Sequence, residues 1–349
     1  MICKNIVNSY LKIIFIIVNF SNSESKTINP ENLSKLNRIE FGFGSCLHQD
    51  RPMPIFEAIK RDSLDFFLMI GDNVYGDTER IDLHELKLAY KKQKNNFRQM
   101  KLNFPFEAIW DDHDYGLNDG GKDYKFKEAS KELFLNFWNV SEDDKRRIRP
   151  GLYYELSKMV GDKIVQFLFL DTRTFRDPLV DSNEKGSLGK ERYIPSKDTS
   201  LTMLGEFQWK WVERKINKSV DFRIIISPIQ FLPIGHGWES WNNLPHERAR
   251  LINLVEKSDL NNTLFISGDR HRGGAYEIRT KSNKRIIEMT SSSLNVSYPN
   301  KEELGPFRLG STFIEENYGT IFIDSKENLM LINLKSINGS IMQRLRIKN

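Results

Sequence analysis

The stretch DFFLMIGDNVYGDT, residues 65–78, joins an apolar run of strand length to a glycine and a group of polar side chains. A short, continuously apolar run that is bounded by glycine is typical of a strand buried on both faces. The polar residues that follow it are Asp72, Asn73 and Tyr75. Because the end of a buried strand holds side chains on a rigid backbone, this stretch predicts that oxygen donors are delivered to a site at a sheet edge.

Three other segments repeat the order of apolar run, small residues and polar side chains. They are RIEFGFGSCLHQD (38–50), AIWDDHDYGLNDGG (108–121) and NTLFISGDRHRGG (262–274). The potential ligands that they add are Cys46, His48, Asp111, Asp112, His113, Asp269 and His271. Carboxylates, imidazoles, a phenol and a thiol form a mixed ligand set, which two neighbouring cations can share through a bridging carboxylate. The repeated pattern predicts a metal site assembled from four strand ends.

The chain has 349 residues, 39% of them hydrophobic and 28% charged, and this length is sufficient for a large buried core. Its net charge of +5 comes from Lys and Arg residues that are spread along the sequence. Dispersed charge argues against specific nucleic-acid binding. No Pro- or Gly-rich linker divides the sequence internally, so we expect one catalytic domain at 37–349, preceded by a linker at 24–36.

The amino terminus has the pattern of a secretory signal. Lys4 and Lys12 flank or open an apolar stretch from Leu11 to Phe20, which is too short to span a bilayer. We expect a signal peptide at 1–23, no transmembrane segment in the mature chain, and a secreted or otherwise extracytoplasmic protein, such as one in the endomembrane lumen. A buried strand and an uncleaved anchor are the alternatives.

Cysteine usage agrees with a ligand role for one thiol. The chain has two cysteines, and Cys3 would leave with the signal. A single remaining Cys46 cannot form an internal disulfide, which leaves a buried thiol, an intermolecular bridge or a metal ligand. Its place at a strand end beside His48 favours the ligand. Glycosylation sequons at Asn139, Asn217 and Asn295 support secretion only weakly.

Apolar runs alternate with helical patterns along the whole sequence. Helical spacing occurs at 53–62, 82–100, 126–139, 205–216 and 245–257. Residues 151–175 have the pattern of a hairpin that turns at Gly161 and Asp162, and the tail from 275 to about 345 has the pattern of further hairpins. An early β-α-β order followed by antiparallel pairs predicts an α/β fold, a layered α/β/β/α sandwich of two mixed sheets flanked by helices.

An ordered set of motifs gives the sequence a more specific likeness. The motifs are FGSC, GDNVYGD, WDDHDYG, LDTRTFRDP, MLGEFQWKW, WESWNNLPHER and SGDRH, between Phe41 and Arg272. Together and in this order they resemble the alkaline phosphatase D (PhoD-like) family of calcineurin-like metallophosphatases. The resemblance implies the metallophosphatase type of sandwich and a phosphoric ester hydrolase.

The resemblance also assigns ligands residue by residue. Asp72 matches the bridging aspartate of a Gly-Asp motif, and His271 matches the last histidine of the closing motif. Three positions depart from the broader superfamily: Cys46 replaces an aspartate, Asp112 an asparagine and Asp269 a histidine. Cys46 and Tyr75 resemble the PhoD-like version of the site.

In that version, thiolate and phenolate are associated with ferric iron, and calcium occupies neighbouring sites. Ligand chemistry agrees, because thiolate and phenolate suit Fe³⁺ and a carboxylate-rich remainder suits Ca²⁺; other divalent metals are also compatible with a binuclear or multinuclear site. The mechanism implied is attack on phosphorus by a metal-bound hydroxide. His113 would act on the leaving oxygen, and Arg173 would clamp a phosphate oxygen.

Several residues keep two interpretations. His48, Asn73 and Asp111 are candidates for contacts to the ligands or to substrate, although Asp111 has the position of a helix cap. The turn-like positions of Asp77, Asp114 and Asp119 leave their roles open.

Three other function classes compete with this hypothesis. A cysteine-dependent phosphatase would pair Cys46 with Arg51, but that loop needs five intervening residues and this chain has four. A serine hydrolase lacks its G-x-S-x-G motif here. A non-catalytic metal-binding protein remains compatible with the sequence. Within the hydrolases, the ester is a phosphomonoester or a phosphodiester of a small molecule, lipid or nucleotide, and a phosphodiesterase or phospholipase activity is the nearest alternative.

Overall fold

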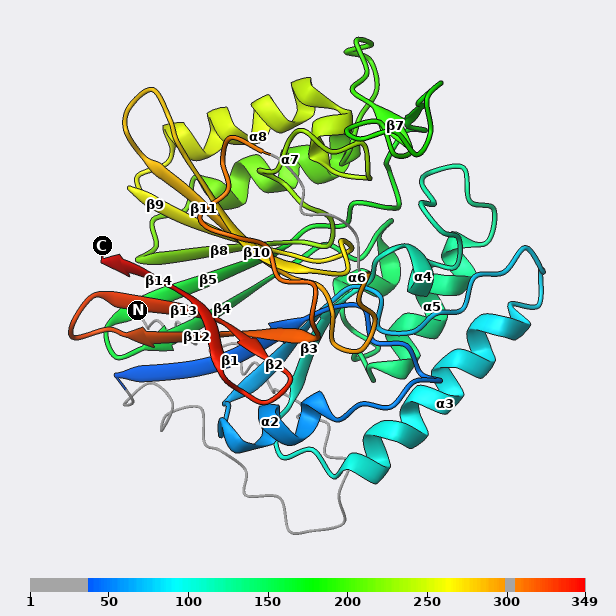
Figure 1. Cartoon of the computed structure of the whole chain (residues 1–349), viewed down its shortest axis with the longest axis horizontal. Helices are drawn as coiled ribbons and strands as arrows, with labels where there is room; N and C mark the ends of the chain where they lie inside the picture. The colour runs from blue at the N-terminus through cyan, green and yellow to red at the C-terminus, as the bar shows by residue number, and fades with distance from the viewer. Residues whose placement is uncertain (1–36, 299–304, 349) are drawn as a thin grey trace, which may run out of the picture.

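The computed structural model describes residues 37–298 and 305–348, which form two six-stranded sheets packed face to face between layers of helices (Figure 1). This arrangement confirms the predicted α/β/β/α sandwich. The predicted signal at 1–23 and the linker at 24–36 lie outside the described residues, as does the cleavage site between them.

The first sheet has the order β14-β13-β12-β1-β2-β3. Strands β1, β2 and β3 are parallel, and β12, β13 and β14 extend the sheet by antiparallel pairing from β1. The bounds are β1 Arg38–Gly44, β2 Phe66–Ile70, β3 Phe106–Ile109, β12 Asn317–Asp324, β13 Leu329–Ser336 and β14 Ile341–Lys348.

The second sheet has the order β10-β11-β9-β8-β5-β4. Its four central strands are parallel, and β10 and β4 pair antiparallel at its two edges. The bounds are β4 Tyr154–Val160, β5 Lys163–Phe169, β8 Phe222–Ser227, β9 Asn262–Ser267, β10 Gly273–Arg279 and β11 Arg285–Ser291. A separate small hairpin pairs β6 Val180–Asp181 with β7 Tyr193–Ile194.

Helices cover the outer faces of both sheets (Figure 1). Helices α2 Ile55–Arg61 and α3 His84–Met100 lie under the first sheet, and α7 Gly205–Ile216 and α8 Pro245–Lys257 lie over the second. Helix α5 Lys127–Phe137 packs beside α3, and α4 Asp112–Tyr115, α6 Lys145–Ile148 and η1 Trp241–Asn243 are short. None of the helices in the described part of the chain combines the length and the apolar character that a membrane span requires.

Aromatic rings join the two sheets. Phe41 of β1 stacks on Phe66 of β2 with ring centroids 4.7 Å apart, and it meets Phe167 of β5 edge to face at 5.2 Å. All three side chains are buried and belong to one continuous apolar core. Since aromatic pairs add to the free energy of burial, this contact fixes the sheets relative to each other and therefore fixes their strand ends.

The strands and long helices lie within a few residues of the predicted ranges, but the tail differs in one respect. Its strands form hairpins as expected, yet β11 also runs parallel to β9 and completes the second sheet. The four-residue helices α4 and α6 were not predicted, because one helical turn is too short to produce a periodic apolar pattern.

Gly319 of β12 provides a test of how tightly the first sheet is packed. It lies opposite Phe43 of β1, and a Cβ atom at Gly319 would be 2.1 Å from the Phe43 ring. We expect Gly319→Ala to lower the free energy of unfolding by about 1–3 kcal/mol, because the buried ring must move. Denaturant titration would measure this loss. Adding Phe43→Leu should recover part of it, and strict additivity of the two substitutions would contradict the proposed clash.

Candidate metal centre

Four parallel strands end at one place in the sandwich and deliver the candidate ligands. Cys46 follows β1 closely, Asp72 follows β2, Asp112 begins α4 just after β3, and Asp269 follows β9. Ligand atoms of Cys46, Asp72 and His271 all lie within 4.8 Å of one another. The same is true of Asp111, Asp112 and Asp269, so the two sheets contribute to one cluster.

The backbone at the ligand positions has an unusual conformation. Cys46, Asp72, Asp269 and His271 have φ values of 60°, 50°, 67° and 53°, in the left-handed region that side chains other than glycine rarely occupy. Each such residue costs roughly 1–3 kcal/mol, and surrounding packing must hold it in place. Conformations of this kind cluster at functional sites, which supports a functional role for the cluster.

A first group joins the thiol, the phenol and one carboxylate. The Sγ of Cys46 and the hydroxyl of Tyr75 each lie 3.3 Å from Asp72 Oδ2. His271 completes the group, and its Nδ1–H donates to the carbonyl of Val296 at 2.9 Å. That bond leaves Nε2 of His271 as the available ligand atom, which is the arrangement that metal-binding histidines usually have.

A second group shares the carboxylate of Asp72 with Asp112 and His113, and Asp112 in turn belongs to the group of Asp111 and Asp269. Since Asp72 takes part in two groups, its carboxylate can bridge two cations. Asp111 Oδ2 is buried and has no hydrogen-bond partner among the described residues. A metal ion would supply the partner that this oxygen lacks.

The electrostatics of the cluster also favour bound cations. Burial, reinforced by Cys46 and Asp112, raises the pKa of Asp72 well above its usual range. Burial and neighbouring carboxylates raise the pKa of Asp269 to about 7, and burial raises the pKa of the Cys46 thiol to about 11. These acidic groups therefore cannot all ionise together without a compensating charge, which cations would provide. The donor set and its environment fit a site of two or more metal ions.

The raised thiol pKa also bears on the cysteine-dependent phosphatase hypothesis. A nucleophilic cysteine needs a lowered pKa and an electropositive loop, whereas Cys46 is fully buried next to Asp72. Arg51, the arginine that this hypothesis requires, donates instead to the backbone carbonyl of Asn295. The geometry gives no support to a thiolate nucleophile.

His113 lies at the exposed side of the cluster. Its Nδ1 is 2.6 Å from Asp77 Oδ2, and its ring centroid is 4.2 Å from that of Tyr75. Burial alone lowers the pKa of His113, but Asp112, Asp72 and Asp77 outweigh burial and raise the pKa to about 11. These carboxylates therefore favour the protonated imidazole, and Nε2 is free of the contact to Asp77.

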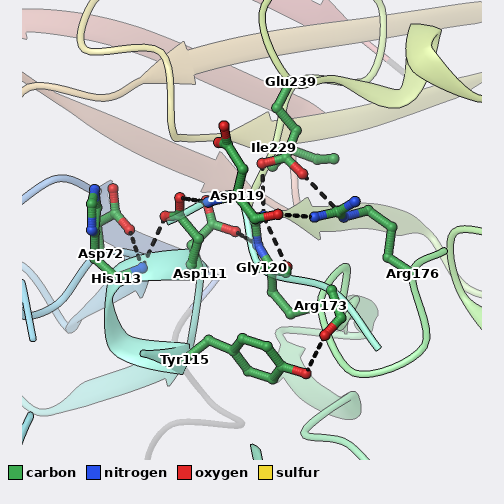
Figure 2. Close-up of polar contacts among 12 residues, drawn as sticks. Asp72, Asp111, His113, Tyr115, Asp119, Gly120, Arg173, Arg176, Ile229 and Glu239 are labelled. Carbon is green, nitrogen blue, oxygen red and sulfur yellow. Dashed lines mark hydrogen bonds and ion pairs between the residues drawn. The ribbon is translucent and has the colours of Figure 1, made fainter. Parts of the chain in front are cut away.

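Arg173 lies in a buried ion network behind the ligands (Figure 2). Its Nε donates to Asp111 Oδ1 at 2.5 Å, and its Nη1 lies 2.7 Å from Glu239 Oε2. Arg176 Nε pairs with the other oxygen of Glu239 at 3.0 Å. Two of the three side-chain nitrogens of Arg173 are therefore directed at protein carboxylates. Since the side chain is 0% exposed, none of the three reaches solvent.

Asp111 and Asp114 form a reciprocal cap at the start of α4, which explains the two interpretations of Asp111. Asp114 also accepts hydrogen bonds from the backbone and side chain of Asn73, and Asn73 Nδ2 donates to the carbonyl of Ile109 at 2.9 Å. Asn73 thus ties the end of β2 to the end of β3. His48 belongs to none of the ligand groups; its ring stacks on Tyr75 with centroids 4.8 Å apart.

The structure adds residues that the sequence left open or did not indicate. Asp77 contacts His113, and Asp119 donates its backbone N–H to Asp112 Oδ2 at 2.7 Å. Glu239 and Arg192 come from distant loops. Asp77 and Asp119 lie in or close to recognised motifs, and Glu239 lies in the motif WESWNNLPHER, although that motif did not indicate its contact with the arginines. Arg192 carries no local signal, because only the fold brings it to the cluster.

Comparison with known families gives one match over most of the chain. A family model described as PhoD-like phosphatase matches residues 41–342. Alkaline phosphatase D of Bacillus subtilis (strain 168) is 23% identical over 317 residues, a match that covers 78% of this chain and 51% of the relative. The chain therefore spans about half the length of that curated relative.

Solved structures of related fold agree. A structure of PhoD has a TM-score of 0.68 at 16% identity, covering 90% of this chain and 69% of the other. Purple acid phosphatase PPD1 from yellow lupin (Lupinus luteus) seeds has a TM-score of 0.58 at 9% identity, covering 90% and 54%. GAP50, described as the anchor in the inner membrane complex of Plasmodium, has a TM-score of 0.57 at 14% identity, covering 89% of each chain. At these identities the likeness concerns the fold.

Calcium binding would test the cluster directly. Adding Ca²⁺ to chelator-treated protein should raise Tm, since a cation bound only to the folded form contributes about 2.7 kcal/mol at 100 times its Kd. Asp112→Asn should reduce this rise strongly, because three of the candidate groups use Asp112. Differential scanning fluorimetry would measure both. The exposed Asp143 provides the control, and a Ca²⁺ response in Asp112→Asn as large as in Asp143→Asn would count against the site.

Proposed function

The chain belongs to the PhoD-like phosphatase family, and from this premise we propose that it is a metal-dependent hydrolase of phosphoric esters. The observation that carries the proposal is the ligand cluster, in which the carboxylate of Asp72 is shared between a group with Cys46 and His271 and a group that includes Asp112. A bridged pair of metal ions is the arrangement that phosphoester hydrolysis commonly uses.

We propose iron at the group formed by Cys46, Asp72, Tyr75 and His271, and calcium at the group of carboxylates that includes Asp112 and Asp269. Thiolate and phenolate are ligands for a trivalent, polarising ion, while several carboxylates suit a hard divalent ion. When bound, such ions lower the pKa of a water nucleophile and neutralise the charge that develops on phosphate oxygens.

The chain's own residues position the proton donor. Asp77 accepts from Nδ1 of His113, which fixes the ring and leaves Nε2–H directed away from that carboxylate. The neighbouring carboxylates raise the pKa of His113, which favours the protonated imidazole as the donor of a proton to the leaving oxygen. Proton donation of this kind typically contributes about 10²–10⁴-fold to the rate.

We propose that Arg173 acts on the ligands and not on the substrate. Its guanidinium lies between Asp111 and Glu239 with no exposed surface, and these carboxylates hold Nε and Nη1, which supports a positioning role in place of the phosphate clamp expected from the sequence. By holding Asp111 Oδ1, Arg173 orients the free oxygen of that carboxylate toward the cluster. Arg173 is therefore a positioning residue in this proposal.

The proposed setting is extracytoplasmic. The pattern at 1–23 supports export. Of the three sequons, the one at Asn295 is unsuited to glycosylation, because Asn295 is 3% exposed and its side-chain amide donates to the carbonyls of His48 and Pro52. Asn139 and Asn217 are exposed and are the better acceptors.

The experiment that tests the function compares two esters and the metal content. Wild-type protein should hydrolyse p-nitrophenyl phosphate, bis-p-nitrophenyl phosphate or both, and elemental analysis should find iron and calcium. Asp72→Asn should lower kcat roughly 10³-fold and release metal, because the bridging carboxylate stabilises both ions. Asp143→Asn should keep both properties. Metals without turnover on either ester would favour a non-catalytic, metal-binding protein.

A pH profile would test the pairing of Asp77 with His113. Asp77 raises the pKa of His113, so Asp77→Asn should lower that pKa. If protonated His113 is the acid, activity is present below its pKa and is lost as the pH rises through it, and the basic limb of kcat/KM should shift to lower pH in Asp77→Asn. An unchanged basic limb, with turnover retained, would remove His113 from this role.

A further inference from the structure

A hairpin on the rim of the metal centre is docked firmly against the loop that precedes η1. The hairpin is formed by residues 180–194, and the backbone N–H groups of Arg192 and Tyr193 both donate to the carbonyl of Gly237, at 2.9 and 2.7 Å. The backbone N–H of Gly237 donates to Glu191 Oε2 at 2.5 Å. A Cβ atom at Gly237 would lie 2.4 Å from the Glu191 nitrogen, so the approach depends on glycine.

The docking holds the side chain of Arg192 in one place. Its guanidinium forms an ion pair with Asp119 and lies over the ring of Trp238, 5.4 Å from the centroid. Tyr193 donates its hydroxyl to the same carboxylate oxygen of Asp119 at 2.8 Å. A second guanidinium, that of Arg270, lies 5.1 Å from the Trp238 centroid. An arginine held by a carboxylate and an aromatic ring loses little further entropy when it binds an anion.

Arg192 is also close to the metal ligands. Asp119, its partner, donates its backbone N–H to Asp112 Oδ2, and the carboxylates of Asp112, Asp119 and Glu239 lie within 4.8 Å of one another. Asp119 therefore joins the two groups: its side chain pairs with Arg192, and its backbone N–H donates to the candidate ligand Asp112. The side chain of Asp119 is itself only 11% exposed, so the pair lies at the edge of the buried cluster.

Exposure distinguishes Arg192 from the arginines behind the ligands. Its side chain is 39% exposed, whereas those of Arg173 and Arg176 are 0% and 2% exposed. A substrate that arrives from solvent can reach a guanidinium only where it has accessible surface. Among these three arginines, Arg192 alone meets that condition.

We infer that Arg192 is the substrate-binding cation of this centre, and that it favours phosphomonoester dianions over phosphodiester monoanions. The inference rests on the proposed function and specifies its substrate class. A monoester presents two anionic oxygens and a diester presents one, so a fixed positive charge attracts the monoester more strongly. The planar guanidinium can hold two of the three non-bridging oxygens of a monoester, whereas a diester has only two such oxygens in all.

Substitution of Arg192 separates the two esters. Arg192→Gln should lower kcat/KM for p-nitrophenyl phosphate roughly 10–50-fold, the loss expected for a charged hydrogen bond. For bis-p-nitrophenyl phosphate the loss should stay below about 3-fold, because a singly charged ester gains less from the cation. Arg192→Lys should retain part of the monoester rate. Binding of inorganic phosphate, measured by calorimetric titration, should weaken in parallel with the monoester rate.

Lys190 provides a matched control on the same hairpin. Its side chain is 43% exposed and pairs with Glu184 instead of Asp119. Lys190→Gln should change neither ester by more than about 2-fold. Trp238→Leu removes the ring under Arg192 and should produce a smaller loss with the same preference for the monoester.

The outcomes distinguish this inference from the proposed function. Equal losses on both esters in Arg192→Gln, or no loss on either, would overturn the inference while hydrolysis by the wild type stands. Metal content and Tm should match the wild type, and a loss of metal would show a role in holding Asp119 and would also overturn substrate contact. If the wild type hydrolyses neither ester, the affinity for inorganic phosphate still tests the role of Arg192. An affinity in Arg192→Gln equal to that of the wild type would overturn the inference.

Discussion

Repulsion among buried acidic groups is the constraint on which the rest of this centre depends. Asp72, Asp111 and Asp112 lie together with almost no exposed surface, next to a buried thiol, and the partly exposed Asp269 completes the group. Burying one carboxylate without compensation is costly, and burying three of them beside a fourth is possible only if protons or cations share the charge. Arg173 supplies one positive charge from behind, where it contacts Asp111. The remaining positive charge that balances the carboxylates must come from the side that faces solvent, where metal ions would enter.

The fold meets this constraint by rigidity rather than by local sequence preference. Left-handed backbone at Cys46, Asp72 and Asp269 is unfavourable for these residue types, and it persists because the strands before them cannot move. The contact of Phe41 with Phe167 joins the sheets that carry these strands. Packing energy from the core therefore offsets the strain and the electrostatic cost at the strand ends.

The same reasoning explains which features of the fold and of the candidate site could be predicted from the sequence. The strand ends at Asp72, Asp112 and Asp269 follow continuous apolar runs, so their convergence could be predicted from the periodicity and the topology of an α/β fold. The role suggested for Arg173 could not be settled in this way, because a motif gives no information about burial. Its pairing with Glu239 joins residues 66 positions apart on different loops, and only the packed structure places them together (Figure 2).

Burial also determines whether an arginine of the site can contact a substrate or only the candidate ligands. A guanidinium that is fully enclosed has already exchanged water for Asp111 and Glu239, and moving it to a substrate would leave Asp111 without its ion-pair partner. An arginine at the rim retains part of its hydration and can exchange it for phosphate oxygens. The buried arginine is thus tied to the strand ends, which must stay fixed to hold metal. Substrate contacts fall instead on a hairpin such as 180–194, whose side chains can change between relatives without disturbing the ligands.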